Sequence, residues 1–408
     1  MVDVLIIGAG PSGSMSAALL ASKGYEVLVL EKQRFPRFSI GESLLASTAG
    51  MLSEAGMLDA VMSCGFQFKN GATFVRDDDY SEFNFADKSS EGFPYTFQVE
   101  RAQFDQVLAD EAARRGATVR YEVEITAVDA SGERPVVTAK AGDEITTYRP
   151  RFVLDASGFG RTLPRLLDLD RPSDFPARAA LFVHVKDNIV SGVFDRQKIR
   201  IGVHPTKADV WSWLIPFSNG NASLGVVASR EHHAKFSGTN EERLWQLIAE
   251  EPGLHELLEK AQTVRAVGEL AGYAAKVSRL HGPGFALLGN AAEFLDPVFS
   301  SGVTIALKSA RLAAELLDKQ FRGEAVDWEA GFAEPLNYGV ETFRSFVDGW
   351  YNGDLQDVIF FEHKEPVIRR MICSVLAGYA WDQKNPYTGP QSARRLRALA
   401  NTVRAARS

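Results

Sequence analysis

Residues 2–31 read VDVLIIGAGPSGSMSAALLASKGYEVLVLE and predict a strand, a glycine-rich turn, a helix and a second strand. Residues 2–7 are apolar and rich in β-branched side chains, as in a strand buried on both faces. Residues 14–23 are rich in alanine and leucine and end at Gly24, which is typical of a helix C-terminus. Residues 26–30 form the second apolar strand. This order predicts an α/β protein with a parallel sheet.

The turn between the first strand and the helix carries Gly8, Gly10 and Gly13 in the pattern G-x-G-x-x-G. The first glycine allows a tight turn, the second lets a pyrophosphate approach the backbone, and the third permits close packing of helix on strand. The helix N-terminus offers free N–H groups and a partial positive charge to that phosphate. Glu31 ends the second strand, where a carboxylate accepts hydrogen bonds from ribose hydroxyls. The pattern predicts a dinucleotide site and does not distinguish NAD from FAD.

The length and composition restrict the class of protein. A chain of 408 residues suits two or three packed units. The formal net charge of -7 gives no electrostatic basis for nucleic-acid binding. The cysteines, Cys64 and Cys373, are far apart, and the histidines show no metal spacing, so we expect neither a disulfide framework nor a metal site. The N-terminus lacks a secretory pattern and no apolar run is long enough for a membrane span, so we expect a cytoplasmic enzyme.

Beyond residue 31 the pattern alternates between helical and strand-like stretches. We expect helices at 44–62, 101–115 and 303–317, and buried strands at 152–154 and 285–288. The predicted organisation is a discontinuous nucleotide-binding domain of parallel-sheet type, an antiparallel-sheet substrate domain inserted into it, and a helical C-terminal cap. These parts are assigned to residues 1–75, 100–179 and 271–330, to residues 76–99 and 180–270, and to residues 331–408, respectively.

Two distant segments and one arginine distinguish between the two dinucleotides. Residues 153–158 read VLDASG and place Asp155 at the end of a strand, and GNAA at 289–292 follows another strand. Together with the glycine motif and Arg101 in QVERAQFD, they resemble the FAD-binding domain shared by aromatic hydroxylases, geranylgeranyl reductases and flavin-dependent halogenases. The resemblance covers nearly the whole chain. It implies that FAD is the cofactor, that Arg101 lies along the flavin and that the segment after Gly289 holds the ribityl chain. The family usually has Gly-Asp there, whereas this chain has Asn290, which lacks the charge.

Three further segments resemble the halogenases in particular, and the first is WSWLIP at 211–216, which matches W-x-W-x-I-P. Trp211 and Trp213 are two residues apart and therefore share one face of a strand. The resemblance implies an active-site wall that keeps the organic substrate away from the flavin. The alternative is a pair of packed core aromatics.

The second segment is FKNGATF, which contains Lys69. A lysine at a similar place in the halogenases meets the hypohalous acid that leaves the flavin. This chemistry requires an amine in a dry tunnel, where the pKa of a lysine falls readily. The alternative is a solvated loop lysine.

The third segment, DPVFSSGV at 296–303, matches a halogenase segment that lies beside the flavin ring and includes Pro297 and Val303. The backbone N–H groups of Ser301 and Gly302, at the start of a helix, would bind a halide. The alternative is a flavin contact without halide, as in related reductases. The enzymes that halogenate free tryptophan carry a glutamate where Phe299 stands. We therefore expect Phe299 in the active-site wall and a phenol, a pyrrole or a carrier-bound acyl group as substrate.

Two other segments complete the predicted site. FSIGES at 38–43 resembles the segment that packs near the flavin ring, which assigns Gly41, Glu42 and Ser43 to the cofactor. The last residues, 391–408, carry five arginines and no acid. Such a run is usually a solvated helix face, and the alternative is docking to an acidic carrier domain.

The resemblance implies a complete reaction. Reduced FAD, delivered by a separate flavin reductase, would use O2 and chloride or bromide to form hypohalous acid, which Lys69 would guide to an electron-rich aromatic substrate. One alternative is an FAD-dependent hydroxylase, dehydrogenase or reductase that acts on a polyketide or polyene-type acyl substrate without halide. Another is a flavin-binding protein without turnover that serves as a carrier or sensor.

Overall fold

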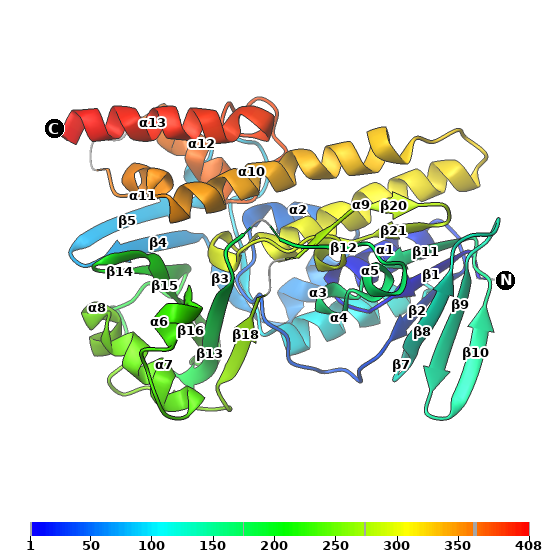
Figure 1. Cartoon of the computed structure of the whole chain (residues 1–408), viewed down its shortest axis with the longest axis horizontal. Helices are drawn as coiled ribbons and strands as arrows, with labels where there is room; N and C mark the ends of the chain where they lie inside the picture. The colour runs from blue at the N-terminus through cyan, green and yellow to red at the C-terminus, as the bar shows by residue number, and fades with distance from the viewer. Residues whose placement is uncertain (1, 174, 273–274, 362–364, 408) are drawn as a thin grey trace.

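The computed structural model describes residues 2–173, 175–272, 275–361 and 365–407 and contains a central six-stranded sheet (Figure 1). Its strand order is β20-β21-β11-β1-β2-β7, and all neighbours run parallel except β20 and β21. The strands are β1 (Val4–Ile7), β2 (Val27–Glu31), β7 (Thr118–Tyr121), β11 (Phe152–Asp155), β20 (His281–Gly282) and β21 (Phe285–Leu287). The predicted α/β fold with a parallel sheet is therefore confirmed.

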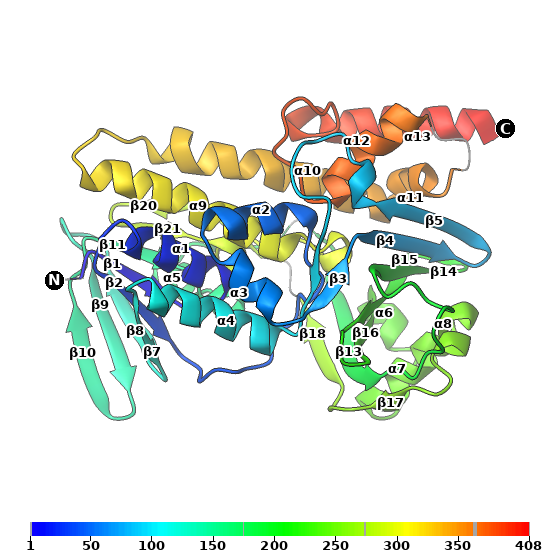
Figure 2. The same ribbon diagram turned by 180° about the vertical axis from the view of Figure 1, so that it is seen from behind.

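Different layers cover the two faces of this sheet, because alternate residues of a buried strand point to opposite sides. Val4 and Ile6 share a core with α1 (Pro11–Ala21), α4 (Arg101–Arg114) and α9 (Ser301–Phe321). Leu5 and Ile7 share a second core with a three-stranded sheet, which lies beside β7 and β2 in Figures 1 and 2. That sheet contains β8 (Glu124–Asp129), β9 (Val136–Ala141) and β10 (Glu144–Tyr148).

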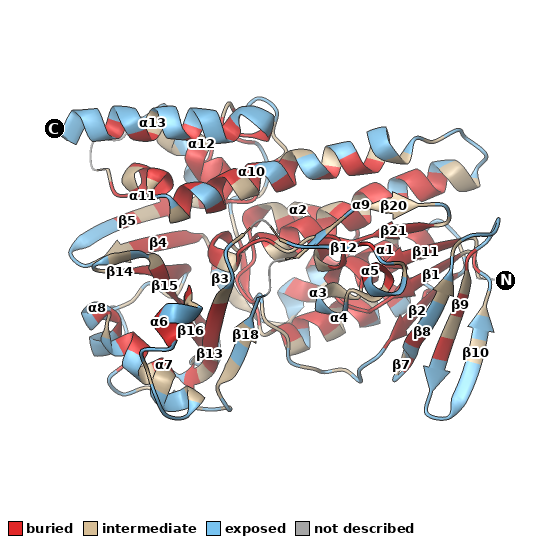
Figure 3. Ribbon diagram, viewed as in Figure 1, coloured by how far each residue is buried: buried red, intermediate tan, exposed pale blue. Residues whose placement is uncertain are grey.

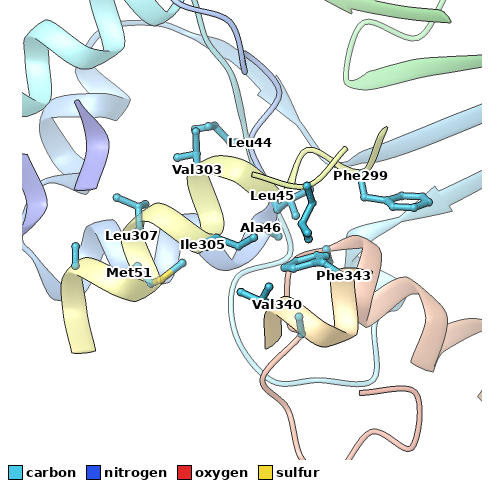
Figure 4. Close-up of a cluster of buried hydrophobic side chains, with 14 of the residues drawn as sticks. Leu44, Leu45, Ala46, Met51, Phe299, Val303, Ile305, Leu307, Val340 and Phe343 are labelled. Atoms are coloured by element: carbon cyan, nitrogen blue, oxygen red, sulfur yellow. The ribbon is translucent and has the colours of Figure 1, made fainter. Parts of the chain in front are cut away.

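The helix expected at 44–62 is wrong in its extent, because two shorter helices occupy this stretch. They are α2 (Ala46–Glu54) and α3 (Leu58–Ser63). Gly56 lies between them with φ +65°, a left-handed conformation that ends a helix and that glycine adopts without strain. In Figure 4, Val303 of α9 is drawn beside Leu44, Ile305 beside Ala46, and Leu307 beside Met51 of α2.

A second sheet, of eight strands, forms the other half of the molecule. Its order is β17-β13-β16-β15-β14-β4-β5, with β18 beside β13. The strands are β4 (Gly71–Arg76), β5 (Asp79–Asn84), β13 (Arg178–Lys186), β14 (Lys198–His204), β15 (Lys207–Pro216), β16 (Asn221–Ser229), β17 (Gln262–Thr263) and β18 (Gly268–Ala271). The boundary expected after residue 75 lies inside β4, and β4 pairs along its length with β5 and β14. The β4–β14 pairing is parallel, so the sheet expected to be antiparallel is mixed at this point.

Short connecting elements lie around the two sheets. β3 (Gln67–Lys69) and β6 (Thr96–Gln98) form a separate ribbon, as do β12 (Asp170–Arg171) and β19 (Lys276–Val277). α5 (Thr162–Leu166) follows β11, and α6 (Arg230–His233), α7 (Asn240–Ala249) and α8 (Pro252–Leu257) follow β16. α7 and α8 share a core with one face of the eight-stranded sheet.

The C-terminal region is helical, as predicted, and contains α10 (Glu334–Tyr351), α11 (Asp354–Ile359), α12 (Pro366–Leu376) and α13 (Ser392–Arg407). One side of α13 is exposed, and Leu396, Ala400 and Val403 are buried on the other (Figure 3). Its Arg404 and Arg407 pair with Asp357 of α11. Part of the positive charge considered for carrier docking is therefore neutralised within the protein. Along the described ranges, no helix combines the length and the apolar character that crossing a membrane requires.

Candidate active site

A cavity of about 650 Å³ opens between the carboxyl ends of the central strands and the eight-stranded sheet. This volume is typical of a site for a cofactor or small molecule. The lining residues lie within eight stretches of the chain: 7–12, 30–43, 101, 123–125, 156–165, 180–215, 269–270 and 290–306.

The three glycines of the turn have different surroundings. Gly8 has φ +95°, and a Cβ on it would lie 2.7 Å from the carbonyl oxygen of Ala156. A Cβ on Gly13 would lie 2.0 Å from the carbonyl oxygen of Gly8, so this glycine allows α1 to pack against the turn. A Cβ on Gly10 would meet only Arg37 Nη2, at 3.7 Å. Gly10 therefore leaves open cavity space beside a cation, which fits a pyrophosphate.

Glu31 lies at the end of β2, lines the cavity and is 6% exposed. Its Oε2 accepts a hydrogen bond from the Ala9 amide at 2.9 Å, and its Oε1 accepts one from the Gln33 amide at 2.9 Å. Carboxylate oxygens have further lone pairs, which remain for ribose hydroxyls. The position and partners of Glu31 therefore fit the predicted ribose contact.

Three arginines line the cavity, and one buried carboxylate holds two of them, Arg101 and Arg37. Arg101 pairs with Asp105 through two hydrogen bonds of 2.7 and 3.0 Å and also donates to the Ile40 carbonyl at 2.7 Å. Arg37 Nη1 lies 3.0 Å from the same Asp105 carboxylate. Arg101 was predicted from its motif, whereas Arg37 was not, because no local sequence pattern places Arg37 beside α4.

The segment after Arg37 turns at Gly41, which has φ +96° and whose Cβ would lie 3.1 Å from Arg101 Nη1. Glu42 and Ser43 follow, and both line the cavity. The Glu42 side chain is buried, and His184 Nε2 of β13 donates to its Oε1 at 2.6 Å. The sequence did not indicate His184 either, because the histidines show no metal spacing and no motif includes this one.

Lys69 ends β3 and is 1% exposed, so the alternative of a solvated lysine is wrong. Its Nζ donates to Ser43 Oγ and to the Leu44 carbonyl, each at 2.7 Å, and lies 5.3 Å from the centre of the Phe85 ring. Within the described part of the chain, no carboxylate pairs with this amine. Burial lowers the pKa of Lys69 to about 7. Lys69 is not among the residues lining the cavity, but its partner Ser43 is.

The two tryptophans of β15 line the cavity, and their ring centres are 5.8 Å apart. Trp213 Nε1 donates to Ser223 Oγ of β16 at 3.1 Å. Trp211 Nε1 donates to the Tyr351 hydroxyl of α10 at 2.9 Å, and this hydroxyl donates to Asp296 Oδ2 at 2.7 Å. These bonds fix both indole rings against the cavity.

Residues 296–303 form a tight turn that leads into α9. Ser300 has φ +56°, α9 begins at Ser301, and Pro297, Gly302 and Val303 line the cavity with Ser301. Their backbone amides at a helix N-terminus can bind an anion.

Phe299 does not line this cavity, contrary to the expectation of a wall residue. Its ring centre lies 5.7 Å from that of Trp350 and 6.2 Å from that of Phe346, both on α10. Figure 4 labels Phe299 together with Phe343 of α10. Phe299 is the last residue of a 3₁₀ turn in which successive side chains diverge by about 120°, and Pro297 and Val298 line the cavity whereas Phe299 does not.

Asp155 and Gly289 support the site without lining it. The buried Asp155 carboxylate accepts hydrogen bonds from the Ser157 and Leu163 amides at 2.9 and 2.6 Å, and burial raises the pKa of this carboxyl. A Cβ on Gly289 would lie 2.9 Å from that of Ala306, so this glycine serves the packing of α9. Asn290 lines the cavity as expected.

Comparison with known proteins identifies the class and then the family. The family described as FAD binding domain matches residues 1–330. The 1H-pyrrole-2-carbonyl-[peptidyl-carrier protein] chlorinase of Pseudomonas fluorescens is 31% identical over 94% of this chain and 90% of its own length. A crystal structure of a flavoprotein/dehydrogenase from Cytophaga hutchinsonii is 45% identical with a TM-score of 0.96, covering 100% of both chains. The flavin-dependent brominase Bmp2 is 25% identical with a TM-score of 0.83, covering 99% of both chains.

The class that the fold and cavity define is an FAD-dependent oxidoreductase, and FAD is its cofactor. Within that class, the chain belongs to the flavin-dependent halogenase family. Both conclusions confirm what the three segments of the sequence predicted.

Proposed function

We propose that this protein halogenates an electron-rich aromatic substrate and that Lys69 is its catalytic amine. The observation that carries this proposal is the environment of Lys69. Its amine is buried, has a pKa of about 7 and is bonded to Ser43, which lines the cavity for FAD. Near neutral pH a substantial fraction of such amines is unprotonated. The amine can therefore receive hypohalous acid either as a nucleophile or, when protonated, as a hydrogen-bond donor.

Bound FAD, reduced by a separate flavin reductase, supplies the chemistry that converts O2 and a halide to hypohalous acid. The amides of Ser301 and Gly302 hold the halide at the N-terminus of α9, where the helix dipole favours an anion. Trp211 and Trp213 keep organic molecules away from the flavin side of the cavity. In the final step the aromatic ring gains the halogen and loses a proton, and this proton leaves with the hydroxide of the acid as water.

The relatives support an aromatic substrate, either free or linked to a carrier. The chlorinase of Pseudomonas fluorescens and a brominase of Pseudoalteromonas luteoviolacea, which is 28% identical over 93% of this chain, are both named for a pyrrole-2-carbonyl group on a peptidyl-carrier protein. A pyrrole or phenol ring is electron-rich enough to react with hypohalous acid once the protein holds the two together.

The test compares Lys69→Ala with the parent protein and with Lys260→Ala, which changes an exposed lysine outside the cavity. Each protein receives FAD, a flavin reductase, bromide or chloride, and a phenol or pyrrole, and products are identified by mass spectrometry. We expect Lys69→Ala to lose halogenation and to retain FAD binding and oxygen consumption. Undiminished halogenation by Lys69→Ala would reject the assignment.

The second candidate is oxidation or reduction without halide by the same flavin. It is supported by the 45% identity to the Cytophaga hutchinsonii protein, which is called a flavoprotein/dehydrogenase. Omitting halide from the assay distinguishes the two, because product formation that is unchanged without chloride and bromide favours this candidate.

A further inference from the structure

A second cavity, of about 550 Å³, lies away from the FAD cavity, and the two share no lining residue in the described part of the chain. It lies between α2, the loop before β6, α9 and the chain that follows α12. Its lining includes Ser47 and Gly50 of α2, Phe93, Lys308 of α9 and Trp381.

The segment from Ser43 to Ser47 connects the two cavities. Ser43 lines the FAD cavity and Ser47 lines the second one. Lys69 Nζ donates to Ser43 Oγ and to the Leu44 carbonyl, so the amine lies against the part of the chain that passes from one cavity to the other. The Ser47 hydroxyl is buried and makes no hydrogen bond within the described residues, which leaves it available to a bound molecule.

The second cavity contains Lys308, whose nearby carboxylates, Glu54 and Glu315, both form their ion pairs with Arg311. Lys308 lies 5.6 Å from the centre of the Trp381 ring and forms no ion pair with the described residues. Its partial burial lowers the pKa of this amine, and a bound anion beside it would stabilise the protonated form. The neighbouring Arg311 differs, because it pairs with Glu54 at 3.0 Å and with Glu315 at 3.0 Å.

The remaining lining groups favour a flat aromatic molecule. Phe93, Tyr379 and Trp381 contribute aromatic rings, and the Tyr379 hydroxyl is already used by the Phe93 carbonyl at 2.9 Å. The Asp382 carboxylate accepts a hydrogen bond from Ser90 Oγ at 2.5 Å, so it has a partner within the protein. Glu91 and Lys384 also line the cavity, but both are exposed, so water solvates their charges. Apolar rings beside the half-buried Lys308 amine fit an aromatic ring that carries a carboxylate.

We propose that the second cavity binds the acceptor substrate as a free aromatic carboxylic acid, with its carboxylate on Lys308 and its ring towards Ser47. This inference rests on the proposed halogenation and specifies its substrate class. It separates this protein from the two pyrrole relatives, whose names give a carrier-linked carbonyl, because a thioester has no carboxylate charge to pair with Lys308.

The test measures binding to the FAD-loaded protein by calorimetry, with oxidised FAD and without reductant. The probes are pyrrole-2-carboxylate and 4-hydroxybenzoate, each paired with its neutral methyl ester. We expect the acids to bind at least about tenfold more tightly than their esters, as for hydrogen bonds to a charged group. Lys308→Met should remove that difference, whereas Lys319→Met, an exposed lysine on the same helix, should leave it unchanged.

Two variants at Gly50 test the location. A Cβ on Gly50 would have its nearest neighbour at 3.7 Å, on Phe93, so Gly50→Ala should fold and bind the acids normally. Gly50→Leu places a larger side chain in the cavity and should abolish acid binding while FAD affinity stays the same. Equal binding of acids and esters, unchanged binding by Gly50→Leu, or preference for a carrier-linked thioester would overturn the inference. Acid binding as described without any halogenated product would instead reject the proposed function alone.

Discussion

The Lys69 amine destabilises the folded protein only while it carries a proton. Burial lowers its pKa to about 7 from the ordinary 10.5, so between these values the unfolded chain holds a proton that the folded chain has released. Lys69 therefore makes the free energy of unfolding rise with pH across this window, by up to about 1.4 kcal/mol per pH unit. In Lys69→Met we expect a correspondingly weaker rise. Urea denaturation of the FAD-loaded protein at pH 7, 8 and 9 measures it.

The control for this prediction is Lys260→Met, which replaces an exposed lysine with the same side chain. It should follow the parent protein at every pH. Parallel curves for Lys69→Met and the parent protein would mean that the amine keeps its proton in the folded state.

Arg37 lines the cavity, although the sequence did not indicate it. Its guanidinium faces the open space above Gly10 and is held by the Asp105 carboxylate at 3.0 Å. If it pairs with the pyrophosphate of FAD, Arg37→Met should weaken FAD binding by about 10- to 100-fold, as expected for a lost charge-assisted hydrogen bond. Arg34→Met, at an exposed neighbour outside the cavity, should change little. Quenching of flavin fluorescence on addition of FAD to the apoprotein gives both affinities.

At the scale of elements, two glycines of the turn between β1 and α1 have different expected functions. We expect Gly13 to be needed for folding and Gly10 to be needed for FAD binding. Gly13→Ala would push a methyl group into the Gly8 carbonyl, at 2.0 Å, so we expect a loss of thermal stability even without FAD. Gly10→Ala has no neighbour closer than 3.7 Å and should leave the apoprotein as stable as the parent, while the methyl group occupies the place of the pyrophosphate. Thermal melts with and without FAD distinguish the two. A normal FAD response by Gly10→Ala would contradict the assigned role.

Elements with a local sequence signal were predicted, and those that depend on distant pairing were not. The strands β1 and β2 and the helix α1 were predictable because apolar runs and glycines mark them directly. The break at Gly56 was missed because a glycine inside a helical pattern ends a helix only when the following chain turns away. The parallel pairing of β4 with β14 and the sheet formed by β8, β9 and β10 have no local pattern of their own.

At the scale of the whole molecule, the site consists of contacts between segments far apart in the chain. Glu42 meets His184, and Lys69 meets Ser43, across 142 and 26 residues. The motifs indicated that Glu42, Ser43 and Lys69 belong to the site, but only the packing of β3 and β13 against the segment after Arg37 determines their partners. The sequence could therefore predict the chemistry of these side chains without predicting their geometry.

The Tyr351 hydroxyl joins three parts of the molecule, and its removal tests how strongly they depend on one another. It accepts from Trp211 of β15 and donates to Asp296, which precedes α9, so it links the C-terminal helices to both sides of the FAD cavity. Tyr351→Phe leaves the Trp211 N–H without this acceptor and removes one donor from the buried Asp296 carboxylate. We expect the free energy of unfolding to fall by about 1–3 kcal/mol.

The matched variant for this prediction is Tyr338→Phe on the same helix, whose hydroxyl bonds only to Thr388 Oγ1, at 3.0 Å, among the interactions of the described residues. Because Tyr338 is only partly buried, water can replace its hydroxyl, and the loss should stay below about 1 kcal/mol. Urea denaturation of both FAD-loaded variants measures the difference. Equal losses would show that the Tyr351 hydroxyl contributes no more to stability than the partly exposed Tyr338 hydroxyl does.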